Sequence, residues 1–307
     1  MTVDLTVKKR SQTHDMASKD LFVPVDSPRI QLRLLNRNVV ITAESDAILA
    51  TIRRWFDFAF PIIDRLDSPD LRIHLRKTSP AQESPWIIES NPRLGCKDSP
   101  PSRVDVVEYL IKHLHEWIIS VAHEYHVFHA AAVALGNLGV LLPGPSRAGK
   151  STLTAALARG GLAVLSDEVG AVRLVDDKLV HYPRVLCIRQ DVMSLFGLGG
   201  RTDLLCGRSR PALVAAEHLG GTRVPDARFS AIIVPRWRAG TSIKIKPLNK
   251  RNTLLLLEKA SCALSGNQTS RIERLIEWVN TLPSFQLTFE KLDYAVEAVS
   301  KIVSDET

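Results

Sequence analysis

The residues with the clearest chemical meaning in this sequence form a glycine-rich loop at positions 144–151. They read Gly-Pro-Ser-Arg-Ala-Gly-Lys-Ser and match the pattern G-x-x-x-x-G-K-[ST] at every fixed position. Glycines let the backbone approach phosphate oxygens closely, and successive backbone N–H groups can then point at the anion. Lys150 is placed to reach the β- and γ-phosphates, and the Ser151 hydroxyl is placed to bind Mg²⁺. The sequence therefore predicts a site for the phosphates of a nucleotide.

The residues around this loop supply the context that the motif needs. An apolar run at 139–142 predicts a buried strand before it, and residues 152–159 predict a helix that ends at Gly160 and Gly161. The start of that helix adds partial positive charge where phosphates would lie. The residues expected to contact the nucleotide are Gly144, Pro145, Ser146, Arg147, Ala148, Gly149, Lys150, Ser151 and Thr152. These contacts recognise phosphates, so they leave the base of the nucleotide undetermined.

Two acidic residues follow the next predicted strand. The apolar run at 162–165 ends in Ser166, Asp167 and Glu168. A protein with a phosphate loop needs a carboxylate at the end of a neighbouring strand to hold or orient Mg²⁺. With two acids, one can serve the metal and the other can accept a proton from a hydroxyl group. The plainer interpretation of the pair is a solvated acidic turn.

Histidines precede the loop. His129 lies in a predicted strand, at 127–135, where a histidine is more often a core residue than a catalytic one. Four more histidines lie nearby, and most are expected on the solvated face of a helix predicted at 104–125: His113, His115, His123 and His126. This placement makes a histidine metal site the weaker interpretation.

Three segments together resemble the catalytic domain of HPr kinase/phosphorylase, and more closely its diverged bacterial homologues. They are the strand from His129 to Val133, the loop at 144–151, and the acidic segment at 166–169. The resemblance extends to residues 182–189 and 234–240. It implies an α/β fold, a P-loop kinase domain of the HPr kinase and phosphoenolpyruvate-carboxykinase-like type, with a small N-terminal α+β region. It also implies ATP-dependent phosphorylation of a hydroxyl group with Mg²⁺ as cofactor.

The resemblance implies roles for individual residues. Asp167 corresponds to the catalytic base of the family, Glu168 to the acid on the metal side with Ser151, and His129 to the histidine that helps to position the reacting phosphate. Lys150 keeps its role in the loop. One or more arginines are expected to help Lys150 offset charge on the transferred group: Arg184, Arg189 and Arg236. The sequence departs from the family at Glu168, which replaces an aspartate, and in the segment at 187–190 that is associated with phosphorolysis.

The acceptor that this resemblance implies is a serine hydroxyl on a protein or peptide. Some diverged homologues look like peptide-tailoring enzymes, so a ribosomal-peptide precursor is an option, and a small metabolite is another. A different class of function is a nucleotide-binding regulator with little or no phosphotransfer. Family members are often oligomeric, which makes a homo-oligomer an option as well.

The composition and charge of the chain limit the classes of ligand and the compartment that we expect. The net charge is +7, and residues 184–251 hold thirteen Lys and Arg against four Asp and Glu, which favours an anionic ligand. No nucleic-acid-binding motif accompanies this charge, which argues against DNA or RNA as the partner. No apolar run is long enough to span a bilayer, and no signal peptide is recognisable. The four cysteines are widely spaced, so a cytoplasmic protein without disulfides is expected.

Apolar periodicity predicts the elements that position these residues. Residues 1–20 are expected to be a flexible tail, 21–100 a small α+β region, and 101–307 the catalytic domain. Within the second part, alternation predicts strands at 30–34, 39–41 and 71–75, Ser45 starts a helix ended by Pro61, and 78–103 is expected to be a loop. Further strands are predicted in seven segments: 162–166, 170–175, 179–182, 185–189, 230–234, 242–246 and 285–289. A capping box at Ser270 and a last helix at 290–303 complete the prediction.

Overall fold

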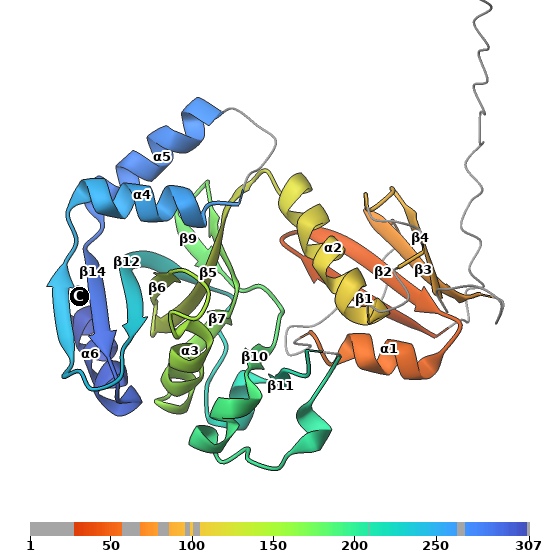
Figure 1. The fold of residues 1–307 in the computed structure, drawn as a ribbon. Helices are drawn as coiled ribbons and strands as arrows, with labels where there is room; N and C mark the ends of the chain where they lie inside the picture. The colour runs from red at the N-terminus through yellow and green to blue at the C-terminus, as the bar shows by residue number, and fades with distance from the viewer. Residues whose placement is uncertain are drawn as a thin grey trace, which may run out of the picture.

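The computed structural model describes residues 28–56, 68–78, 86–95, 99–100, 105–207, 209–262 and 268–305. They form a mixed α/β structure with a small sheet near the N-terminus and a larger, helix-covered sheet after it (Figure 1). The predicted tail at 1–20 and the expected helix end at Pro61 lie outside the described residues. No helix in the described part is both long and apolar enough to cross a membrane.

The small sheet has four strands in the order β1-β2-β3-β4: β1 (Arg29–Leu34), β2 (Arg37–Ala43), β3 (Leu71–Lys77) and β4 (Trp86–Asn91). The predicted alternation is confirmed in β1, where Ile30, Leu32 and Leu34 are buried. The expectation of a loop throughout 78–103 was wrong, because β4 pairs with β3 along its length. Pro92 follows this strand directly and does not interrupt its ladder.

Two helices pack in the same apolar cluster as the small sheet, α1 (Asp46–Arg53) and α2 (Val106–Val121). Ser45 precedes α1 as predicted, but its side chain makes no capping hydrogen bond. Asp105 caps α2, where its carboxylate accepts the N–H of Val107 at 2.8 Å. The helix predicted as far as Tyr125 ends earlier, because Tyr125 pairs with Arg173 and starts the next strand. The domain boundary near residue 100 stays a prediction.

The larger sheet runs in the order β13-β14-β12-β6-β5-β8-β9, with β7 beside β5. Its strands are β5 (Tyr125–Leu135), β6 (Leu138–Pro143), β7 (Ala163–Ser166), β8 (Val169–Arg173), β9 (Lys178–Val180), β12 (Asp226–Trp237), β13 (Lys244–Pro247) and β14 (Ser284–Phe289). β12 is parallel to β6 and β14, whereas β5, β8 and β9 run antiparallel to their neighbours. β9 also pairs with the beginning of β12, so the sheet curls back on itself.

Helices cover both faces of this sheet. One face carries α3 (Lys150–Arg159) and α6 (Leu292–Ser304), and the other carries α4 (Lys250–Ala260) and α5 (Gln268–Thr281). The start of α5 at Gln268 places Ser270 inside the helix, so the predicted capping box is wrong. The sequence analysis did not predict α4, although Asn249 caps it by accepting the N–H of Asn252 at 2.8 Å.

A third group of elements packs beside α3. It contains the two-stranded sheet of β10 (Leu186–Ile188) and β11 (Ala212–Val214) and the short 3-10 helices η1 (Gln190–Phe196), η2 (Thr202–Leu204) and η3 (Ala216–Leu219). Of these, only β10 was predicted. Most of this group shares an apolar cluster with α3. Figure 1 shows this group between α3 and α1, so it connects the larger sheet with the N-terminal part of the molecule.

Candidate active site

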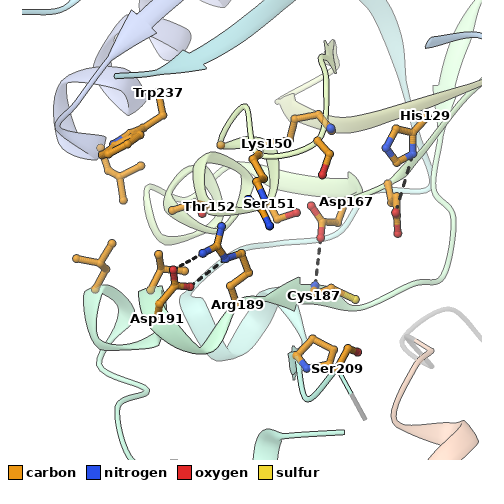
Figure 2. Close-up of a pocket in the computed structure, with 18 of the residues that line it drawn as sticks. His129, Lys150, Ser151, Thr152, Asp167, Cys187, Arg189, Asp191, Ser209 and Trp237 are labelled. Atoms are coloured by element: carbon orange, nitrogen blue, oxygen red, sulfur yellow. Dashed lines mark hydrogen bonds and ion pairs between the residues drawn. The ribbon is translucent and has the colours of Figure 1, made fainter. Parts of the chain in front are cut away.

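A cavity of about 810 Å³ opens beside the loop between β6 and α3 (Figure 2). It is lined by nine of the residues that the sequence analysis singled out for catalysis, nucleotide contact or metal binding: His129, Ser146, Arg147, Gly149, Lys150, Ser151, Thr152, Asp167 and Glu168. Gly144, Pro145 and Ala148 belong to the same loop but do not line the cavity. The fold thus brings the loop, the acidic pair and the histidine to one place from three separate strands.

The backbone of the loop requires a glycine immediately before α3. Gly149 is the N-cap of this helix and has a φ of 94°, a conformation that side chains with a Cβ rarely adopt. A Cβ built there would also lie 3.2 Å from Cβ of Trp237. The N–H of Trp237 donates to the carbonyl of Ala148 at 3.1 Å, which ties the end of β12 to the loop.

Lys150 spans the loop that precedes it. Its Nζ donates to the carbonyl oxygens of Gly144 and Pro145, at 2.8 and 3.1 Å. Burial lowers the pKa of Lys150, whereas the negative charges of Asp167 and Glu168 oppose that change. A cation held in this way is available to a phosphate that enters the loop, because both present partners are neutral carbonyl groups.

Asp167 is a buried carboxyl group at the end of β7, with 3% of its surface exposed. Its Oδ2 accepts the backbone N–H of Cys187 at 3.1 Å, whereas Oδ1 is buried and makes no close hydrogen bond in the described structure, although the Ser151 hydroxyl is near enough to act on this carboxyl group. Burial raises the pKa of Asp167 to about 6, against the opposing effects of the Cys187 N–H, the Ser151 hydroxyl and the Arg184 charge. A buried oxygen without a donor is costly unless a ligand supplies one, so Oδ1 marks a place for a hydroxyl group.

Glu168 points to different partners from Asp167. One of its oxygens forms an ion pair with Arg184, and the other lies 3.9 Å from Nδ1 of His129. Burial and the charges of Lys150 and Arg184 lower the pKa of His129, and only Glu168 opposes them. The neutral imidazole of His129 is therefore favoured, half exposed at the edge of the cavity.

Arg184 joins the acidic pair to the small sheet and its helices. Besides Glu168, it donates to Sγ of Cys187 at 3.7 Å and to Nδ1 of His115 at 3.4 Å. The guanidinium carbon also lies 5.8 Å from the centre of the Trp55 ring. Trp55 follows α1 and His115 belongs to α2, so this largely buried cation connects the N-terminal helices with the site.

The structure separates the three arginines that were expected to assist transfer. Arg184 and Arg189 line the cavity, but Arg236 does not. Arg189 forms a bidentate pair with Asp191, which also lines the cavity.

Several cavity residues were missed by sequence reasoning. Cys187 serves Asp167 through its backbone N–H, a group that carries no residue-type signal. Trp55 is far from the loop in sequence. Trp237 lies in a segment that already supported the family resemblance, and its place directly after an apolar strand was the available signal.

Within the part of the chain that the structure describes, the remaining histidines form no metal site. His115 and His126 are buried, so the expectation that they lie on a solvated face was wrong for both. His115 packs against Phe56 and Tyr182, and His126 bonds to the Ser261 hydroxyl at 2.8 Å. The described residues contain no cluster of three or more His, Cys, Asp or Glu able to hold a metal ion. Within them, the cysteines at 187, 206 and 262 are free thiols.

Comparison with known proteins finds similarity at the level of structure and not of sequence. No family model and no curated protein matches this sequence. The chain is similar to a structure described as the Hpr(Ser) kinase/phosphatase from Coxiella burnetii, with 14% sequence identity and a TM-score of 0.25. The alignment covers 58% of this chain and 94% of that chain.

Proposed function

We propose that this protein is a kinase that transfers the terminal phosphoryl group of ATP to a hydroxyl group. The observation that carries the proposal is Asp167, a buried carboxylate beside the phosphate loop whose Oδ1 makes no close hydrogen bond to the described residues. A hydroxyl group bound there would donate its hydrogen bond to Oδ1 and would then lose its proton to the same oxygen. A pKa of about 6 suits this role, because the carboxylate is ionised at neutral pH and still has appreciable affinity for a proton.

The loop provides the binding part of this mechanism. Its backbone N–H groups and the beginning of α3 would hold the phosphates, and Lys150 would exchange its loop carbonyls for phosphate oxygens. Arg184 and the half-exposed His129 line the same cavity. Catalysis of this kind is mainly positioning and charge stabilisation, and the residues present supply both.

The residues also fit Mg²⁺. The Ser151 hydroxyl and the Glu168 carboxylate line the cavity and are the oxygen donors that this cation prefers. When bound, Mg²⁺ would neutralise charge on the phosphates. Because protein sites bind Mg²⁺ through one or two carboxylates together with phosphate oxygens, a larger cluster of acidic ligands is not required.

The acceptor we propose is a serine hydroxyl on a protein or peptide. Beyond Asp167 the cavity is bordered by Trp55, Ser209 and Pro211, which lie on the side of the small sheet and of β11. These residues come from outside the nucleotide loop, so they are free to select an acceptor. A small metabolite that carries a hydroxyl group is the alternative that the experiment below would reveal.

Incubation with γ-labelled ATP, Mg²⁺ and an extract of the source cells tests the proposal. Label on a protein, a peptide or a metabolite is expected, and the labelled species identifies the acceptor. Asp167→Asn should keep ATP binding but lose transfer by at least about 100-fold, since general base catalysis contributes on that order. The control Asp203→Asn alters an exposed carboxylate outside the cavity and should transfer at the normal rate.

Two outcomes would overturn this function. Undiminished transfer by Asp167→Asn would remove the proposed base. ATP binding by the wild-type chain that yields only free phosphate, or no product, would instead support a nucleotide-binding regulator.

A further inference from the structure

The cavity extends past the phosphate loop, away from Asp167. Figure 2 shows His129 and Asp167 on one side, Lys150 and Ser151 in the middle, and Trp237 on the far side beyond Thr152. The residues on that far side have no part in the mechanism proposed above. Their character differs as well, because the acid on this side, Asp191, is ion-paired with Arg189, and apolar side chains line the cavity too.

Trp237 is an aromatic side chain left open at the rim of the cavity. Its surface is 53% exposed, although it ends a strand whose preceding residues are mostly buried. Among the exposed large apolar side chains of the described residues, Trp237 and Leu195 also line the cavity. Leu195 comes from η1 and is 54% exposed, and the half-buried Leu292 lies at the start of α6. Three elements therefore contribute apolar side chains to the lining of a cavity that is otherwise largely polar.

The position of Trp237 is held relative to the loop. Its backbone N–H donates to Ala148 at 3.1 Å, and its Cβ would nearly touch a Cβ added at Gly149. The backbone and the Cβ of Trp237 are therefore held at a set distance from the phosphate loop, at the end of a strand and not on a long loop. Such preorganisation lowers the entropic cost of binding a planar ligand.

The direction of a bound nucleotide follows from the groups at each end. In the proposed function, the terminal phosphate lies toward Lys150 and Asp167, where transfer occurs. The opposite end of the phosphate chain must then leave the loop on the side of Thr152, and a nucleoside attached to it would extend toward Trp237 (Figure 2).

We propose that Trp237 is the stacking platform for the nucleobase, with Leu195 and Leu292 completing an apolar subsite. This inference rests on the proposed function for the direction of the phosphate chain. Every base presents a π-face, so stacking on an indole provides affinity whatever the base. The phosphate loop supplies no such contact, because it binds oxygens alone.

Calorimetric titration of the full-length protein with Mg·ATP and with Mg·tripolyphosphate tests this subsite. Tripolyphosphate offers phosphates without a base. Trp237→Ala should weaken ATP about tenfold, as expected for loss of one stacked base, and should leave tripolyphosphate unchanged within about twofold. Trp237→Phe keeps an aromatic face and should restore most of the affinity for ATP. Tyr294→Ala is the matched control, because this aromatic residue is also 53% exposed but does not line the cavity.

The possible outcomes distinguish failure of the base subsite from failure of the proposed kinase function. Equal ATP affinity in Trp237→Ala and the wild-type protein would overturn the subsite. A similar loss for both ligands would also overturn it, because Trp237 would then act on the loop and not on the base. Failure of the wild-type protein to bind either ligand would overturn the proposed function itself, together with the subsite that depends on it.

Discussion

At the scale of the residue, Asp167 is an ionisable carboxyl group in a buried position, and burial disfavours its charged form. The carboxyl group is almost completely buried, and burial raises its pKa from an ordinary value of 3.8 to about 6. The folded protein therefore binds this proton more tightly than the unfolded chain does. It follows that the contribution of Asp167 to stability falls as the pH rises through the window between these two values. A group that weakens the fold at neutral pH is typical of a functional site.

We predict that Asp167→Asn stabilises the protein at neutral pH. The amide has nearly the same shape but carries no charge, so it avoids the cost of a buried carboxylate. The free energy of unfolding should rise by about 1–3 kcal/mol at pH 7.5 and change little at pH 4, since a pKa shift of one unit corresponds to about 1.4 kcal/mol. Urea denaturation at both pH values measures the difference. Unchanged or lower stability at pH 7.5 would contradict the burial of an ionised carboxyl group.

At the scale of the element, the loop and α3 depend on the conformation of Gly149. Its positive φ lets the chain turn from the loop directly into the helix, so that the N–H groups of the first turn face the cavity. Trp237 packs so closely that a side chain at this position meets a steric obstacle in addition to backbone strain. Local geometry and ligand binding are therefore linked at this residue.

Gly149→Ala should lower both stability and ATP affinity. Backbone strain at a positive φ costs on the order of 1–3 kcal/mol, and the contact with Trp237 displaces the loop from its binding conformation. The matched control is Gly136→Ala, in the turn between β5 and β6, where φ is also positive and a Cβ meets nothing within 4 Å. We expect Gly136→Ala to lose stability through strain alone and to bind ATP normally in a titration. Equal ATP affinity for the two variants would refute the special role of the loop glycine.

At the scale of the whole molecule, the apolar cluster of the small sheet extends to residues next to the site. Its apolar cluster includes residues of α1 and α2 together with Val169, Tyr182 and Val185, which surround the acidic pair and Arg184. Arg184 is the polar part of this junction, between Glu168 on one side and His115 and Trp55 on the other. The placement of the acids therefore depends on both halves of the molecule.

Loss of Arg184 should change both the pKa of Asp167 and the free energy of unfolding. The charge of Arg184 lowers the pKa of Asp167, so Arg184→Met should move the window in which stability falls with rising pH to higher pH. Loss of the largely buried ion pair with Glu168 should cost about 1–3 kcal/mol, between the values typical of exposed and buried pairs. Urea denaturation as a function of pH measures both effects.

Arg37→Met is the matched control for this variant. Arg37 also links the small sheet to a later segment, through an ion pair of 2.6 Å with Glu124, but it does not line the cavity. Arg37→Met should lower the free energy of unfolding without moving the pH range in which Asp167 makes stability fall with rising pH. A similar window for both variants would show that Arg184 has only a structural role.

The signals that could be found in the sequence are those contained in a short window of the chain. The phosphate loop is contiguous, the alternation in β1 reflects a strand's own side-chain period, and β5 is a continuous apolar run, so all three could be predicted before any contact was known. The strand that ends in the acidic pair was found in the same way. Predictions failed where pairing with a distant strand determines the local structure. Tyr125 fits the helical pattern of the preceding residues but pairs with Arg173 in a sheet. β4 lies in a proline-rich segment and forms a strand because it pairs with β3.

The environment of the acidic pair was decided by tertiary packing alone. The N–H that Asp167 accepts comes from Cys187, 20 residues away, and the cation beside Glu168 is anchored by side chains of α2 and the end of α1. Neither partner is marked by its residue type, because one acts through its backbone and the other belongs to a stretch rich in arginines. Burial at this junction raises the pKa of one acid and leaves the other ion-paired. Adjacent carboxyl groups with the same local sequence signal thus acquire different chemistry from the three-dimensional packing around them.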